Sequence, residues 1–89
     1  LGLAGVDRRD ALLGLGSTYR SLGQYQNSKE VFASAIKEFP TYRPYKVFLA
    51  LTEFNLSHSN EAIRLLLEQL VQTTSDQEIR SYERALTFY

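Results

Sequence analysis

Seven residues in the first half of this 89-residue chain stand at fixed intervals, and these intervals constrain the fold more than any other feature. The members are Leu12, Leu15, Gly16, Tyr19, Ser28, Phe32 and Pro40. Leu12, Leu15 and Tyr19 are three and four positions apart, and Ser28 and Phe32 are four apart, which is the spacing of one face of a helix. Gly23 ends the first such run, and Pro40 ends the second. The string therefore predicts a pair of helices.

The same string resembles the signature of the tetratricopeptide repeat, in which Trp, Leu, Gly and Tyr precede Ala, Phe and Pro at these intervals. Leu12 stands in place of Trp and Ser28 in place of Ala, which keeps one bulky apolar and one small side chain. The resemblance implies an antiparallel helix pair that must stack on a neighbour to bury its apolar face. It also implies that the chain holds a protein partner.

A shift of 34 residues, the length of one such repeat, places the second half of the chain on the first. Large residues then fall on large ones and small on small: Leu15 on Leu49, Gly16 on Ala50, Ser28 on Ala62 and Phe32 on Leu66. Tyr19 falls on Glu53, which departs from the pattern. We expect one domain over residues 1–89, with repeats at 9–42 and 43–76. Residues 77–89 are expected to form a capping helix or to begin a third repeat.

Helical apolar spacing continues through most of the sequence and predicts five helices in two hairpins plus a C-terminal helix. The expected starts are Asp7 or Asp10, Asn27 or Ser28, Pro44, Asn60, and Ser75 or Asp76. The third helix is expected to end near Leu56, and the fifth to continue to Tyr89. The predicted fold class is therefore all-α, a right-handed solenoid of about five antiparallel helices.

Two glycines inside the first expected helix need an explanation, because each costs roughly 1 kcal/mol relative to alanine. The resemblance places Gly16 where another helix approaches closely. Gly14 either has the same reason or lies exposed.

Charge and composition exclude several classes of function. Ten basic residues balance ten acidic ones, so no overall field attracts nucleic acid or an anionic membrane. No apolar run approaches about 18 residues, so we expect no membrane span. The sequence lacks cysteine, which fits a reducing compartment, and we expect a cytoplasmic protein. Because the chain begins at Leu1, we also expect it to be a fragment of a longer protein.

Candidate catalytic, cofactor and metal residues are not found in the sequence. His58 is the single histidine, and it falls in a polar turn without a cysteine or second histidine to share a metal. We expect it to have no chemical role and no partner. Glu53 falls in an otherwise apolar helix, so it must point to solvent or pair with a cation. The first alternative is favoured, with Phe54 taking the buried place.

The third expected helix is apolar on nearly every side, whereas a packed helix needs a stripe of only roughly 100 degrees. The additional apolar residues predict a second stripe on this helix. This stripe is expected to face the inside of the superhelix, because the first helix of each pair lines that side. The candidate partner-binding groove consists of Leu13, Ser17, Arg20, Val47, Leu51, Phe54, Tyr82, Ala85 and Phe88.

These features predict a non-catalytic interaction module that presents an apolar groove to a peptide, a helix of the same polypeptide or another copy of itself. An alternative is an accessory or dimerisation domain of an enzyme or regulator encoded outside this chain. A further alternative is an RNA-binding helical repeat, but such proteins need a basic, polar inner face. A clamp for a peptide carboxylate would need several cations there, and only Arg20 is a candidate.

Overall fold

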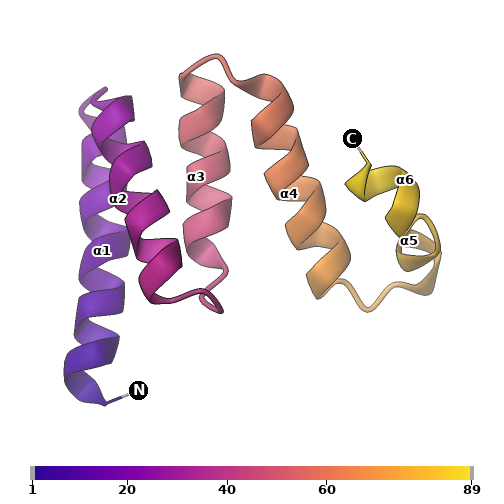
Figure 1. Cartoon of the computed structure of the whole chain (residues 1–89), viewed down its shortest axis with the longest axis horizontal. Coiled ribbons are helices and arrows are strands. Elements are labelled where there is room, and N and C mark those ends of the chain that lie inside the picture. Colours follow the sequence, from indigo (N-terminus) through magenta and orange to yellow (C-terminus); the bar gives the residue numbers. More distant parts are fainter. Residues whose placement is uncertain (1, 89) are drawn as a thin grey trace.

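The computed structural model of this chain describes residues 2–88. Within them the chain forms six α-helices and no strand, which confirms the all-α class (Figure 1). The helices are α1 Leu3–Ser21, α2 Tyr25–Glu38, α3 Pro44–Asn55, α4 Ser59–Thr73, α5 Gln77–Ser81 and α6 Glu83–Thr87.

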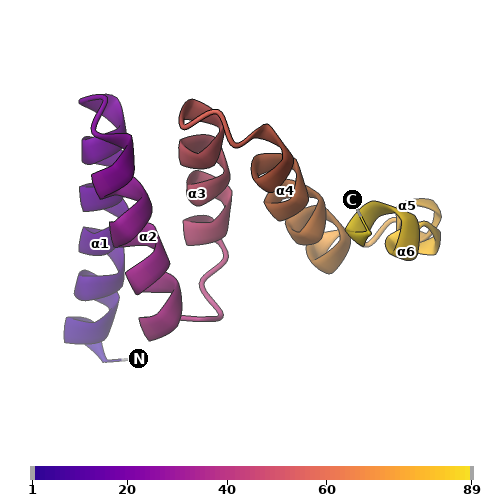
Figure 2. The same cartoon turned by 45° about the horizontal axis from the view of Figure 1, so that its top comes forward.

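The first four helices stand side by side in chain order, each antiparallel to the one before (Figure 1). α1 packs on α2 and α3 packs on α4, and the two hairpins meet where α2 packs on α3. α6 packs on α4, and both views place the terminal segment at the far end of the stack (Figure 2). The described part of the chain therefore has the architecture of a short helical-hairpin solenoid.

The two hairpins turn in the same way. Gly23 follows α1 with a φ of 76°, and Ser57 follows α3, one repeat length later, with a φ of 66°. In each turn the next amide donates to the carbonyl oxygen five residues earlier, at 2.8 Å. A left-handed residue is a common end of a helix, and it costs serine more than glycine. The two turns thus share one backbone conformation, although one has glycine and the other serine at this position.

The core lies between the hairpins. Phe32 and Ala35 of α2 and Tyr45 of α3 have no exposed surface. The ring of Phe32 stacks on that of Phe48, with 6.3 Å between centroids. The buried hydroxyl of Tyr45 donates to the carbonyl oxygen of Arg9 at 2.6 Å, so its polar end is satisfied. A smaller cluster joins α3 to α4 through Ala50, Ala62 and Leu65.

Gly16 lies where the resemblance implied, against the next helix. A Cβ atom added to Gly16 would stand 2.5 Å from two ring carbons of Phe32. The Ser28 hydroxyl donates to the Gly16 carbonyl oxygen at 2.8 Å, in the same buried contact. Gly14, in contrast, has no such neighbour within 4 Å and lies exposed. Of the two explanations left open for Gly14, exposure is therefore the one found in this chain.

Three of the predicted helix starts are wrong. α1 begins at Leu3, so Asp7 and Asp10 lie inside it as exposed residues. α2 begins at Tyr25 without a side-chain cap, because Ser28 is buried between helices instead of capping one. α4 begins at Ser59, before Asn60. Residues suited to capping also occur within helices, where packing decides their role. The third helix, from Pro44 to Asn55, is as predicted.

The C-terminal helix is divided rather than continuous. Asp76 caps α5 as predicted, because its Oδ1 accepts a hydrogen bond from the amide of Ile79 at 2.9 Å. The helix then breaks at Tyr82, and the chain turns so that α6 packs on α4. Neither α5 nor α6 has a buried residue. Tyr89, the expected end of this helix, lies outside the described residues.

Candidate functional site

α1 and α3 form a common surface. Each packs on α2, and they also contact each other directly. Arg20 of α1 donates from Nε to Oδ1 of Asn55, at 2.9 Å, and so links the two helices. This surface carries the predicted groove residues of the first two hairpins.

The predicted residues occupy one stripe on each helix, because both sets are spaced by four and then three positions. On α1, Leu13, Ser17 and Arg20 are half-buried, and Leu13 packs against the Phe32 cluster of the core. On α3, Val47 and Leu51 are half-buried, whereas the side chain of Phe54 is exposed. Phe54 is 64% exposed and is thus the most open large apolar residue of this surface.

The other three predicted groove residues lie on the terminal segment. Tyr82 is 63% exposed, Phe88 is 92% exposed, and Ala85 is exposed as well. This segment reaches the stack through the packing of α6 on α4. The groove residues that a direct helix contact brings together are therefore those of α1 and α3.

The signature residues divide by burial. Gly16, Ser28, Phe32, Ala50 and Ala62 are buried, Leu12, Tyr19 and Leu49 are half-buried, and Leu15, Pro40 and Leu66 are exposed. The buried members all lie in the interior of the two hairpins. Leu15 and Leu66 lie on the outer helices of the stack.

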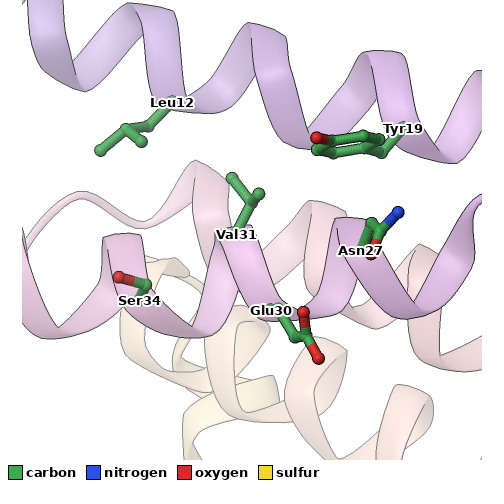
Figure 3. A pocket seen from close by; sticks show the side chains of 6 residues that line it. All are labelled: Leu12, Tyr19, Asn27, Glu30, Val31 and Ser34. Atoms are coloured by element: carbon green, nitrogen blue, oxygen red, sulfur yellow. The ribbon is translucent and has the colours of Figure 1, made fainter.

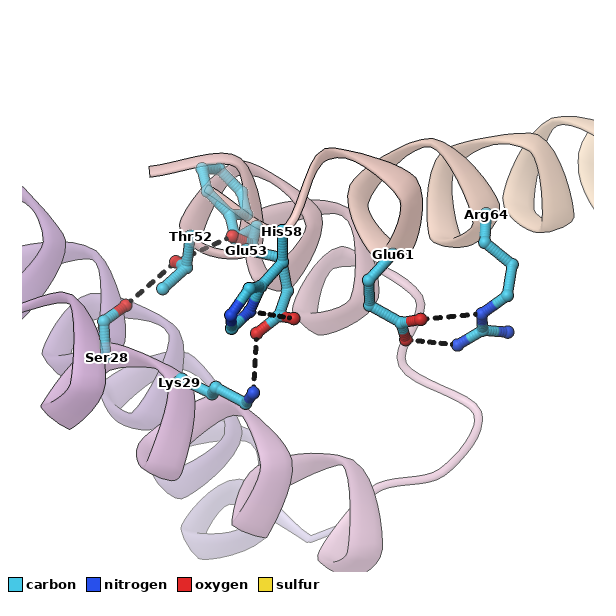
Figure 4. Close-up of polar contacts among 8 residues, drawn as sticks. Ser28, Lys29, Thr52, Glu53, His58, Glu61 and Arg64 are labelled. Carbon is cyan, nitrogen blue, oxygen red and sulfur yellow. Dashed lines mark hydrogen bonds and ion pairs between the residues drawn. The ribbon is translucent and has the colours of Figure 1, made fainter. Parts of the chain in front are cut away.

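Glu53 is buried and paired, so the expectation that it points to solvent is wrong. It is 3% exposed, and Phe54 beside it points outward instead. Lys29 of α2 places Nζ 3.0 Å from Glu53 Oε1, an ionic contact that lacks the alignment of a hydrogen bond. His58 Nδ1 lies 3.1 Å from Oε2 (Figure 4). A buried carboxylate needs such partners, and two other segments supply them.

His58 therefore has a partner, contrary to expectation. Its ring is about half exposed and contacts Glu53, and its backbone amide donates to the Glu53 carbonyl oxygen at 2.8 Å. Glu53 in this way ties α2 to the turn between α3 and α4. One signal of this pairing was available in the sequence. Glu53 stands one repeat length after Tyr19, and Tyr19 faces the second helix of its hairpin.

A hollow of about 280 Å³ lies between α1 and α2 (Figure 3). Leu12 and Val31 face each other across it, and polar side chains border it. Its lining is Leu12, Tyr19, Asn27, Glu30, Val31 and Ser34. A shallow depression of about 410 Å³ lies over the turn at residues 57–61. No group of three His, Cys, Asp or Glu among residues 2–88 is arranged to hold a metal ion.

Glu61 in the first turn of α4 forms an ion pair with Arg64, three residues later (Figure 4). Hydrogen bonds from Arg64 hold the pKa of Glu61 below its ordinary value of 4.5, although partial burial opposes this. The charges of Arg64, Lys29 and His58 lower this pKa further. The folded state is therefore stabilised by ionised Glu61 above the ordinary pKa, and this contribution is lost as the pH falls through the lowered pKa.

Glu61→Gln should reduce the free energy of unfolding by less than about 1 kcal/mol at neutral pH, because the pair is solvent-exposed. At a pH far below the ordinary pKa of 4.5 the difference between variant and parent should shrink, because the parent loses the same charge once the pH falls through the lowered pKa of Glu61. Urea denaturation at both pH values measures it. An equal loss at both would contradict the assignment of the effect to ionised Glu61.

Comparison with known proteins adds one finding. A protein-family model described as tetratrico peptide repeat matches residues 1–89. No curated protein sequence matches the chain. Within the described residues, no helix combines the length and apolar character that crossing a membrane requires.

Proposed function

Because this chain belongs to the tetratricopeptide repeat family, whose members mediate protein–protein interactions, we propose that it binds an apolar helical segment of a protein partner on its α1–α3 surface. The module is non-catalytic in this proposal, as is typical of the family. The observation that carries it is the outward position of Phe54, an aromatic residue on a helix whose other faces pack in the core.

The chemistry of the surface supports an apolar partner. Val47 and Leu51 continue the stripe of Phe54 along α3, and Leu13 lies at the corresponding place on α1. Aromatic residues that stand open in this way dominate the energetics of many protein interfaces. The cation of the surface, Arg20, is already engaged by Asn55. This arrangement favours a helix with apolar side chains over a free carboxylate.

The proposal includes the division of the chain into repeats at 9–42 and 43–76, with residues 77–89 as a cap. Its support is the equivalence of the two hairpins, which end their first helices at Gly23 and Ser57 in the same backbone conformation. A cytoplasmic location, which the lack of cysteine fits, stays a prediction.

A displayed library of random amphipathic peptides, each about 16 residues long, tests the binding surface. Peptides enriched on the parent should lose at least about tenfold in affinity for Phe54→Asp, because a charge replaces the apolar anchor. Leu22→Asp is the matched control. Leu22 is 65% exposed against 64% for Phe54, but it lies at the end of α1 and outside the groove.

The selected peptides should bind the Leu22→Asp variant as they bind the parent. The proposal fails if no peptide is enriched, or if both variants lose binding equally. Circular dichroism of both variants must show the helical content of the parent. Since each side chain is mostly exposed, neither change should unfold the domain.

A further inference from the structure

Arg20 and Phe54 mark the same end of the α1–α3 surface. Arg20 lies in the last turn of α1, and Phe54 stands one repeat length later, near the end of α3. The two helices run in the same direction, because α2 is antiparallel to both (Figure 1). Arg20 reaches Asn55, the residue after Phe54, so its guanidinium group lies at the end of α3 that carries the proposed aromatic anchor.

The contact with Asn55 leaves most of the donors of Arg20 unused. It takes up Nε alone, whereas the guanidinium group carries further N–H donors on its two terminal nitrogens. Within residues 2–88, those two nitrogens have neither a hydrogen bond nor an ion pair. Arg20 therefore carries a positive charge that the described part of the chain does not neutralise.

Other arginines of the chain differ from Arg20 in this respect. Arg8 and Arg64 are paired with carboxylates on the outer faces of the molecule. Arg20 meets the neutral amide of Asn55 instead, and the other predicted groove residues on α1 and α3 are uncharged. The charge of the groove on these two helices is therefore positive, and it is concentrated at the end that carries Phe54.

The end of α1 does not account for this arrangement. A cation in the last turn of a helix is favoured by the partial negative charge of the helix end. However, the carbonyl oxygens of residues 18–20 already accept amides of the turn that follows α1. The Arg20 side chain crosses to α3 instead of folding back onto those oxygens. Its position on the α1–α3 surface therefore calls for another explanation.

Asn55 orients the guanidinium group of Arg20. A hydrogen bond through Nε restricts rotation of this planar group and leaves both terminal nitrogens available. Two parallel N–H groups match the two oxygens of a carboxylate, and such a pair of bonds is stronger than bonds between neutral groups. Arg20 is half-buried, so less water competes for these donors than on an open surface. A carboxylate is therefore the group that this arginine is best arranged to bind.

A carboxylate on a side chain of the partner helix fits this end of the surface. A helix that is already held through Phe54 and the apolar stripe needs only one additional bond from Arg20. Residues three or four apart lie on the same face of a helix. An acidic residue one turn from the side chain that covers Phe54 is therefore on the face that meets Arg20.

We propose that the partner helix carries an Asp or Glu one turn from the apolar residue that covers Phe54, and that Arg20 binds this carboxylate. Arg20 then determines specificity, because a lysine or arginine at that place on the partner would face a cation of like charge. The inference rests on the proposed function, since it assigns the chemistry of the partner that the α1–α3 surface binds.

Two displayed libraries of amphipathic helices, each about 16 residues long, test the inference. Both have random apolar residues on one face, and the remaining positions are Asp and Glu in one library and Lys and Arg in the other. The best acidic peptides should bind the parent at least about tenfold more tightly than the best basic peptides. Raising the NaCl concentration from about 0.05 M to about 0.5 M should reduce this ratio of affinities.

Two variants show whether this preference comes from Arg20. Arg20→Gln removes the cation and keeps a polar side chain, so acidic and basic peptides should then bind within about twofold of each other. Arg80→Gln is the matched control, because Arg80 is exposed on α5 and its loss changes the net charge equally. This control should keep the preference of the parent for acidic peptides.

A change in the peptide tests the same bond without altering the protein. The acidic residues of an enriched peptide are replaced one at a time by the corresponding amides. One position should then cost about tenfold in affinity for the parent, because it loses a charge-assisted pair of hydrogen bonds. The same replacement should leave the affinity for Arg20→Gln unchanged.

The inference is overturned if acidic and basic peptides bind the parent equally, if Arg20→Gln retains the preference, or if Arg80→Gln loses it. Peptides that lose binding to Phe54→Asp would still support the proposed function in each of these cases. If neither library is enriched on the parent, the inference and the proposed function both fail. The two results are therefore distinguishable.

Discussion

Replacing Gly16 with leucine should lower the free energy of unfolding by about 1 to 3 kcal/mol, as expected when a close-packed core is overfilled. Even the first added carbon would stand 2.5 Å from the Phe32 ring. That ring cannot retreat easily, because it is fully buried and stacks on Phe48 and near Tyr45. Chemical denaturation measures the loss.

Replacing Gly14 and Gly16 separately with alanine supplies the control for the close contact. Gly14→Ala should raise the free energy of unfolding by up to about 1 kcal/mol, because it gains helix propensity and meets no atom. Gly16→Ala gains the same propensity but meets the Phe32 ring, so it should destabilise. If the two alanine variants shifted stability in the same direction, the close contact at Gly16 would not be what limits that position.

Lys29→Met should reduce the free energy of unfolding by about 3 kcal/mol, the lower end of the range for a buried charge left without its partner. The Glu53 side chain is only 4% exposed, so water cannot replace the cation. His58 remains in contact and lessens the loss. Guanidinium denaturation of the variant at neutral pH measures it.

A double change separates the charge from the packing. Lys29→Met with Glu53→Met removes both partners and fills the site with apolar side chains, which often leaves stability nearly unchanged. The double variant should recover most of the stability lost in Lys29→Met. A double variant as unstable as Lys29→Met would show that the loss comes from packing of the Lys29 side chain and not from the unpaired carboxylate.

The family and the helix pairs could be predicted from the sequence because they depend on local spacing. Apolar residues three and four apart define a helix wherever it packs, and Gly23 and Pro40 mark its limits. Gly16 was also predictable, since its cost within a helix requires a close neighbour, and Phe32 is that neighbour. These features involve residues within one hairpin.

The partners of Glu53 could not be predicted, because its environment is assembled from three segments. Its own helix indicates an exposed residue, and only the packing of α2 on α3 brings Lys29 to it. Helix starts failed for a related reason, since Asp7 and Ser28 have the chemistry of caps but lie inside helices. The separation of Tyr82, Ala85 and Phe88 from the groove residues of α1 and α3 also depends on tertiary structure. The helix breaks at Tyr82, and α6 then packs on α4.

Ser28 stands where the family signature has alanine, and its hydroxyl has a mechanical consequence. A hydroxyl has one hydrogen, which here goes to Gly16 of α1, while its oxygen lies 3.1 Å from Thr52 of α3. Apolar side chains allow packed helices to slide by small steps, whereas a hydrogen bond holds only at one axial offset. The hydrogen bond from Ser28 to Gly16 therefore fixes how far α2 is displaced along α1, and the Thr52 contact fixes it along α3 whenever the Thr52 hydroxyl donates to Ser28 and not to the carbonyl oxygen of Phe48.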